Sequence, residues 1–281
     1  MPANPAHYLF ATELQSETLD FLELTKTHAY DAAELGQRVG AIMQTPFIME
    51  QVAAHTPEAG YPAATVPLPE APLSDALQLA LQQLNQQRVS TRQFEPRPLA
   101  GEQLARLLRL AYAVTRPHQG LATPLPPGRS VASAGGLYPL ELYYVSLRTT
   151  GLAPGVYHYQ PAHSGRLVLV SDFASDQAFA QAVAEAFLTA EKNDMEYDNA
   201  AGYLVIGAVL QRTCFKYVDR GVRFCLLEAG ALLHAVYLAS AATGIGCCAM
   251  GSYVDNEVRR LIGWQGRLHE PLSVILLGNP A

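Results

Sequence analysis

The sequence predicts an α+β or α/β sandwich in which helices pack on a central sheet. Apolar residues recur at helical spacing in several segments, while other short segments are rich in β-branched and aromatic residues. The two kinds of segment interleave with connections of mixed length, which is typical of that architecture. The 281 residues suit one large domain, or one domain that carries an N-terminal appendage.

The expected elements follow one another along the chain. Leu77, Leu81 and Leu84 mark a first helix, with Ser74 or Asp75 as its cap. Further helices are expected at about 101–114, around 179–187, over a long stretch ending at Thr243 and from about Asp255, and strands at 140–147, 156–159, 167–170, 203–210, 246–250 and 272–277.

Two proline-rich stretches divide the chain. Five prolines between residues 56 and 73 forbid a continuous helix, so an extended connector is expected there. It closes an N-terminal extension, residues 1–73, ahead of a domain over residues 74–281. The extension is expected to pack on its own domain or on a second copy, with docking of a partner as the alternative. The second stretch, residues 116–129, is expected to be a long surface loop.

Composition argues against several classes of protein. The formal charge of −6, from 19 basic and 25 acidic residues, argues against a general nucleic-acid binder. The cysteines show no C-x-x-C spacing, which argues against a metal site and a disulfide framework. The four are Cys214, Cys225, Cys247 and Cys248, and small buried thiols are expected at the adjacent pair Cys247 and Cys248.

No signal peptide or membrane span is expected. The first residues lack a basic segment followed by an apolar core. The longest apolar stretch, residues 224–242, contains Glu228 and His234, which favours a buried helix. We therefore expect a cytoplasmic protein without membrane contact.

Arg88, Ser90 and Arg92 form the first motif with chemical potential, directly after the first helix of the domain. Two guanidinium groups and a hydroxyl can converge on one phosphate. The alternative is a solvated helix end, where arginine favours the terminal carbonyls.

A glycine pair forms the second motif, within the segment 133–139 (SAGGLYP). Paired glycines let the backbone approach a flat ligand and leave N–H groups free to donate to it. An ordinary turn before a strand is the alternative.

Lys216 and Tyr217 form the third motif, near the start of the long helix. Such a pair can act as general acid and base if burial lowers the lysine pKa. The alternative is an exposed lysine beside a half-buried tyrosine.

Three features of the last third of the chain remain to be placed. Glu228 lies in an apolar helix, where a carboxylate must be paired or hydrogen-bonded. A structural ion pair with Arg220 or Arg223 is at least as well supported as a catalytic role. His234 is expected to be a core or interface histidine. The segment 244–252 is a glycine-lined strand edge that suits either a cofactor ring or phosphate, or close helix–strand packing.

The order of these motifs is more specific than any one of them. From residue 74 to 279 the chain resembles the nitroreductase-like flavoproteins, and among them the SagB-type thiazole/oxazole dehydrogenases. The resemblance is carried by the strings R-x-S-x-R-x-F, SAGGLYPLELYYV, GVYHYQPAHSGRL, KYVDRGVRFCLLEAG and TGIGCCAMGSYVDNEVRRLIG.

This resemblance implies an α+β sandwich with a mixed or antiparallel central sheet, which dimerises through its long central helices and binds FMN at the interface. It assigns Lys216 and Tyr217 a place beside the flavin. Where the family often has G-R-P after the last strand, this chain has Gly278, Asn279 and Pro280. The flavin-binding positions implied are Arg88, Ser90 and Arg92 for the phosphate, and Ser133, Ala134, Gly135, Gly136, Met250, Gly251 and Ser252 for the ring.

The activity that the resemblance implies is oxidation of thiazoline or oxazoline rings to azoles in a ribosomal peptide. A cyclodehydratase is then an expected partner and a homodimer the expected state. One alternative is a flavoenzyme that reduces nitroaromatics or quinones, or oxidises a small molecule, with NAD(P)H. A second is a non-catalytic subunit that binds a peptide or a partner protein.

Overall fold

A computed structural model describes residues 13–54, 68–69, 71–116, 127–162, 165–171, 173–188 and 196–281 of the chain. Most of both proline-rich stretches lies outside these residues, so the connector and the long loop expected there stay predictions.

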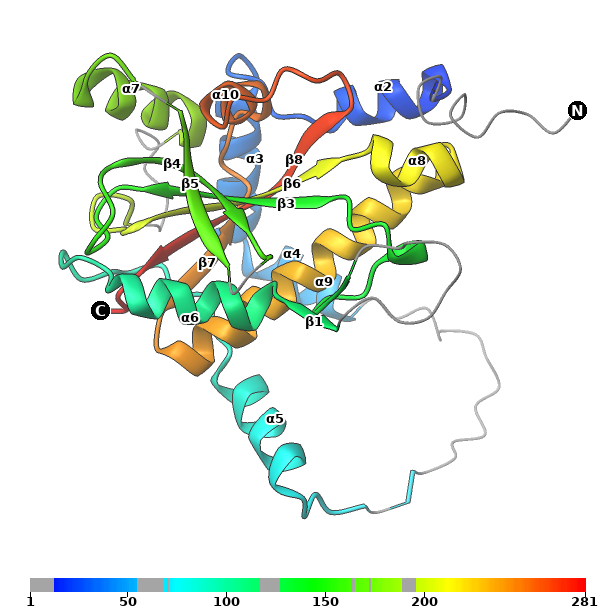
Figure 1. Ribbon diagram of the computed structural model, residues 1–281, viewed down its shortest axis with the longest axis vertical. Helices are drawn as coiled ribbons and strands as arrows, with labels where there is room; N and C mark the ends of the chain where they lie inside the picture. Colours follow the sequence, from blue (N-terminus) through cyan, green and yellow to red (C-terminus); the bar gives the residue numbers. More distant parts are fainter. Residues whose placement is uncertain are drawn as a thin grey trace, which may run out of the picture.

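A six-stranded sheet forms the centre of the molecule (Figure 1). Its strand order is β5-β4-β3-β6-β8-β7, and every neighbouring pair is antiparallel. This arrangement confirms the α+β sandwich, because parallel strands of an α/β fold are not used. The strands are β3 (Leu140–Ser146), β4 (Gly155–Gln160), β5 (Arg166–Ser171), β6 (Gly202–Val209), β7 (Gly246–Met250) and β8 (His269–Gly278).

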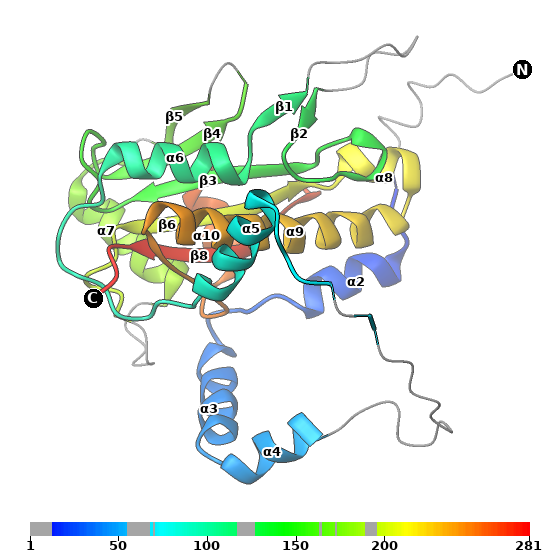
Figure 2. The same cartoon turned by 90° about the horizontal axis from the view of Figure 1, so that it is seen from below.

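Helices cover both faces of this sheet. Side chains that alternate along a strand point to opposite faces, so Leu204 and Val205 of β6 belong to two different cores. One core holds α6 and the long α9, and the other holds α7 and α10 (Figure 2). These helices are α6 (Gly101–Ala111), α7 (Asp176–Phe187), α9 (Arg220–Thr243) and α10 (Asp255–Leu261).

Among the described residues, four helices precede this sandwich. Asp75 caps α5 through a capping box, as expected. The stretch before α3 is tied to the domain: the Thr27 N–H donates to Asp255 (2.9 Å), and the Asp255 N–H donates to the Thr27 carbonyl (3.3 Å). Figure 2 shows α3 and α4 projecting away from the sandwich. The four are α2 (Ser16–Leu24), α3 (Ala32–Met43), α4 (Pro46–Ala54) and α5 (Ala76–Gln87).

The remaining elements are short. α8 (Gln211–Tyr217) is separate from α9. Lys216 and Tyr217 therefore end a helix of their own, which corrects the expectation that they lie near the start of the long helix. After α6, the three-residue strand β1 (Val114–Arg116) pairs with the two-residue strand β2 (Gly128–Arg129). A single turn of 3₁₀ helix, η1 (Ala134–Gly136), follows them.

Two further expectations can be compared with the fold. Cys247 and Cys248 are buried, as predicted; Cys214 and Cys225 are buried as well, and all four thiols are free. In the described part of the chain, α9 is the one helix that is long and apolar enough to span a membrane by length and composition. It packs on α6 and on the sheet, as a core helix does.

Candidate functional site

Gly135 lies against Lys216 and Tyr217. It adopts a φ of +65°, which glycine tolerates and other residues rarely do. A methyl group on its α-carbon would lie 2.7 Å from the Tyr217 hydroxyl and 3.0 Å from the Lys216 Nζ. The structure therefore brings the predicted glycine loop together with Lys216 and Tyr217. Lys216 is exposed and Tyr217 is partly buried, so burial of the lysine, the condition stated for an acid–base pair, is not met in the single chain.

Two non-glycine residues with positive φ flank this contact. Val218 follows Tyr217 with φ 48° and ψ −135°, and Tyr138 follows the glycine loop with φ 46°. Both conformations are costly for a side chain that carries a Cβ, and they persist where the surroundings fix them. The break at Val218 ends α8 and so orients the Lys216–Tyr217 pair. The ring of Tyr217 packs edge-on against Phe224 at 5.0 Å.

Glu228 is buried next to the same loop. Its side chain accepts a hydrogen bond from Ser133, and the Tyr138 N–H donates to Ser133 Oγ at 2.9 Å. Burial raises the pKa of the Glu228 carboxyl to about 7, against the opposing effects of Ser133 and of the Arg129 charge. Its Oε1 has no hydrogen-bond partner among the described residues.

The predicted partners of Glu228 were wrong. The hydrogen bond and the nearest stabilising charge come from Ser133 and Arg129, and not from Arg220 or Arg223, which are exposed. His234 is exposed too, so a core position is excluded and an interface position stays a prediction.

Arg129 is a polar residue of this region that the sequence did not single out. Its Nη1 donates to the Tyr112 hydroxyl at 2.5 Å, and its guanidinium lies over the rings of Tyr112 and Tyr138 at 4.7 and 5.1 Å. The residue ends the proline-rich stretch that was expected to be loop, and no short motif marks it.

The phosphate motif lies elsewhere, beside the second half of α9. Ser90 Oγ is 3.1 Å from the Tyr237 hydroxyl, which also accepts the N–H of Ala249 at 2.9 Å. The Arg88 guanidinium lies 5.6 Å from the centre of the Tyr237 ring. Arg88 and Arg92 are exposed, and no ion pair within the described residues joins either one to a carboxylate.

The predicted residues Met250, Gly251 and Ser252 continue directly from this contact at the end of β7. Met250 is buried in the core that holds α10, whereas Gly251 is exposed and has open space where a Cβ would stand. Asn279 is buried, and its amide donates to the Arg97 and Pro98 carbonyls (3.0 and 3.2 Å), so it braces the backbone near the motif.

The predicted positions thus form two groups on one chain. Ser133 to Gly136 meet Lys216 and Tyr217 at the start of α9. The arginine motif meets β7 and its exit loop beside Tyr237. Arg220 and Tyr237 are separated by about 25 Å of helix, at 1.5 Å per residue. The structure does not bring the two groups together within one chain.

The two groups suit different parts of one ligand. The arginine motif offers two exposed guanidiniums and a hydroxyl, the donors that a phosphate takes. Gly136 and Gly251 both have open space at the Cβ position, so a flat ring can approach their backbone. A nucleotide of a ring and a phosphate therefore fits these residues if two copies of the chain share it.

Comparison with known proteins defines the class. Residues 86–279 match the model of the nitroreductase family. A nitroreductase relative from Methanocaldococcus jannaschii is 30% identical over 193 residues, 69% of this chain and 89% of that protein.

Solved structures show the same fold. A nitroreductase structure from Ralstonia eutropha is 25% identical, with a TM-score of 0.55, over 77% of this chain and 89% of that one. A chain of the E. coli microcin synthetase McbBCD complex, with truncated pro-MccB17 bound, is 19% identical with a TM-score of 0.59, over 96% and 99%. The chain belongs to the nitroreductase family of flavoprotein oxidoreductases.

Proposed function

We propose that this protein is an FMN-dependent dehydrogenase that oxidises thiazoline or oxazoline rings to azoles in a ribosomal peptide. The observation that carries the proposal is the convergence of Lys216 and Tyr217 on Gly135, next to the loop that would lie along the flavin. The likeness in fold to a chain of the microcin synthetase complex, which holds a truncated peptide, supports a peptide as substrate.

The cofactor would be held by both groups of residues described above. Arg88, Ser90 and Arg92 would hold the phosphate, and the loops 133–136 and 250–252 would line the ring. We propose a homodimer in which the start of α9 in one copy meets the second half of α9 in the other. When bound, FMN supplies the acceptor for the hydride equivalent that leaves the azoline.

The chain itself must move a proton. Aromatising the ring removes a proton from one carbon and a hydride equivalent from its neighbour. Tyr217 or Lys216 would take that proton, which requires hydrogen-bond reach, about 3 Å, to the carbon. Gly135 has no side chain to hold the Tyr217 hydroxyl away from the loop.

A mass measurement tests this proposal. The FMN-loaded protein should remove two hydrogens from each azoline ring of a synthetic peptide. Lys216→Ala and Tyr217→Phe should lower that rate, whereas the exposed Arg223→Gln, three residues beyond α9's start, should not. If both variants keep the full rate, the roles of Lys216 and Tyr217 are wrong. If no peptide azoline loses mass, the activity is wrong.

A nitro or quinone reductase is the second candidate, because the M. jannaschii relative that is 30% identical is named a nitroreductase. Such an enzyme takes its electrons from NAD(P)H. Rapid reduction of the bound flavin by NADH or NADPH would favour this candidate, since an azoline dehydrogenase receives electrons from its substrate.

We also propose a role for the extension, residues 1–73, and a partner for the domain. The Gln15 N–H donates to Asp219 at 2.9 Å, and Lys26 Nζ lies 3.4 Å from Glu270. These contacts support packing of the extension on its own domain. We propose a cytoplasmic location for the protein. A cyclodehydratase is the proposed partner, because the related fold occurs in a synthetase complex.

A further inference from the structure

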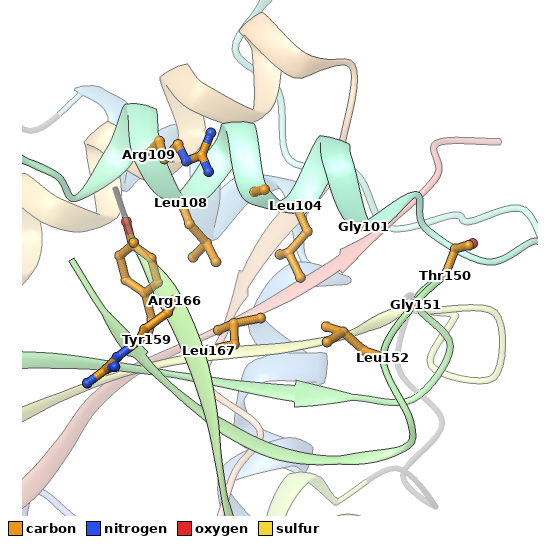
Figure 3. Close-up of a pocket in the computed structure, with 12 residues that line it drawn as sticks. Gly101, Leu104, Leu108, Arg109, Thr150, Gly151, Leu152, Tyr159, Arg166 and Leu167 are labelled. Atoms are coloured by element: carbon orange, nitrogen blue, oxygen red, sulfur yellow. The ribbon is translucent and has the colours of Figure 1, made fainter. Parts of the chain in front are cut away.

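A cavity lies between α6 and the β4–β5 edge of the sheet, the edge opposite β7 (Figure 3). Its volume is about 360 Å³, within the range of sites that bind small groups. Figure 3 shows the side chains of Leu104 and Leu108 on α6 turned toward those of Leu152 and Leu167. The cavity is therefore an apolar slot that runs beside β5.

Polar groups gather at one end of the slot. Tyr159 is 3% exposed, and its hydroxyl has no hydrogen-bond partner among the described residues. Figure 3 shows that hydroxyl directed toward α6, on the side of Arg109. A buried hydroxyl without a partner carries a desolvation cost that a ligand acceptor would remove. The charged residues in the lining are two arginines; Arg166 Nε donates to Gln160 Oε1 at 2.7 Å, whereas Arg109 is the lining cation whose charge acts on Tyr159.

The strand beside the slot is itself unusual. β5 is an edge strand, paired in the described sheet with β4 alone. Val168, Leu169 and Val170 are 36%, 57% and 40% exposed. Natural edge strands are commonly protected by charges or prolines, because unpaired backbone groups beside apolar side chains invite another strand. Here three consecutive exposed residues of an edge are apolar.

We propose that β5 and this slot form a docking site for an extended segment of the peptide substrate, which adds as a further strand beside β5. The segment places an apolar side chain in the slot and a carboxylate at the end marked by Tyr159 and Arg109. Strand addition uses main-chain hydrogen bonds for affinity and a pocket for alternate side chains for selectivity. The cationic lining selects an acidic segment over a basic one. This inference rests on the proposed function, because that function makes a peptide the substrate.

Fluorescence anisotropy of a labelled peptide tests the site directly. The probe alternates leucine and threonine and carries one glutamate; a second probe has lysine at that position, and a third has N-methylated peptide bonds. We expect saturable binding of the first, about tenfold weaker binding of the second, and no binding of the third. Equal binding of the first and third probes would overturn strand addition, and absence of binding would overturn the site.

Two variants with matched controls locate the binding. Tyr159→Phe removes only the hydroxyl and should weaken the glutamate probe several-fold, whereas Tyr157→Phe, on the same strand but outside the slot, should not. Leu169→Glu should weaken it about tenfold, whereas Leu79→Glu, an exposed leucine of α5, should leave it unchanged. Circular dichroism confirms that each variant is folded. Equal effects of variant and control would overturn the placement.

Two outcomes separate this inference from its competitors. One outcome is that sedimentation shows self-association of the wild-type protein and that Leu169→Glu abolishes this self-association. In that case a second copy of the chain occupies β5, and the proposal of a peptide site there is rejected. The anisotropy needs no turnover, so failure of azoline oxidation with intact peptide binding would reject the proposed function alone. With both intact, Leu169→Glu should raise KM for the azoline peptide and leave kcat unchanged; a change confined to kcat would contradict docking.

Discussion

A residue with positive φ stands at each end of α9, and the two differ in cost. At its C-terminal end the helix is capped by Gly244 with φ 69°, where glycine carries no strain and a Cβ would meet open space. At its N-terminal end the chain passes through Val218 with φ 48°, which is costly for a β-branched residue.

The polar side chains near the first half of α9 also differ from those near its second half. Near the second half of α9, the Tyr237 hydroxyl contacts both Ser90 and the Ala249 N–H. In the first half, the carboxyl of Glu228 is buried and its Oε1 has no hydrogen-bond partner among the described residues; the hydroxyls of Thr213, before the helix, and Ser240, in its second half, both lack one as well. Strain and unsatisfied polar atoms concentrate at functional sites. The comparison therefore supports the proposal that the start of α9 performs the chemistry and that its second half holds the cofactor.

The largest effect is expected beside the second half of α9, at the proposed phosphate site. Replacing both Arg88 and Arg92 by alanine removes two charged donors from the proposed phosphate site. Because each charged hydrogen bond contributes about 2 kcal/mol, the Kd for FMN should rise about a thousandfold. Flavin fluorescence quenching measures this affinity. Arg97 is an exposed arginine paired with Glu95, so Arg97→Ala is the control and should bind FMN normally. If both variants lose the same affinity for FMN, the assignment of Arg88 and Arg92 to the phosphate is wrong.

Gly135→Ala should have the next largest effect, on kcat. The added methyl group would displace the Tyr217 hydroxyl, and a shift of about 1 Å in a reacting group can lower the rate about a hundredfold. Gly244→Ala is the matched control, because its φ is equally positive and its Cβ meets nothing within 4 Å. It should lower the stability by about 1 kcal/mol and keep the activity. Similar kcat values for the two variants would contradict the placement of Tyr217.

Glu228→Gln should change how stability depends on pH. The unfolded carboxyl titrates near 4.5, and the folded one near 7. Between these values the folded protein binds more protons, so its stability falls as the pH rises through this window. Glu228→Gln removes that contribution and should be more stable than the wild type at pH 8 by about 1 to 3 kcal/mol, with no gain at pH 4. Urea unfolding at both pH values measures the difference; a gain that is independent of pH would exclude the titration.

The smallest expected effect is at Val218. Val218→Gly relieves the positive φ and should stabilise the protein by about 1 kcal/mol. The same change loosens the break that orients α8, so kcat should fall while Tm rises. Leu188→Gly, at φ 48° after α7, should raise Tm without the loss in kcat. A parallel response of the two variants would mean that the strain at Val218 has no link to the reaction.

Local patterns made most of the fold predictable. Five of the six sheet strands were expected within one or two residues of their observed bounds, since β-branched and apolar runs such as residues 203–210 are strong signals. The sixth, β8, begins three residues before the expected start at 272. The break at Val218 was not predicted, because nothing in KYVDRG marks a positive φ. The apolar run therefore seemed to begin one helix with Lys216 and Tyr217 at its start.

The candidate site was predictable in its residues but not in its grouping. Arg88 and Gly135 could each be singled out by residue type and spacing, yet which of them lies near Tyr217 depends on the course of α9. The partners of Glu228 were missed for the same reason. Ser133 and Arg129 are about a hundred residues away in sequence, and only the packing of β2 and η1 beside α9 brings them close.

Subunit complementation tests the shared site most directly. The Arg88→Ala/Arg92→Ala chain and the Gly135→Ala chain are produced together, and azoline oxidation is compared with that of each variant alone. Suppose that the residues beside the second half of α9 in one chain and those at the start of α9 in its partner form one site. A mixed dimer then has one intact site of two. Because random pairing makes half of the dimers mixed, about a quarter of the wild-type activity should return. Activity no higher than that of the separate variants would contradict the division of the site between two copies.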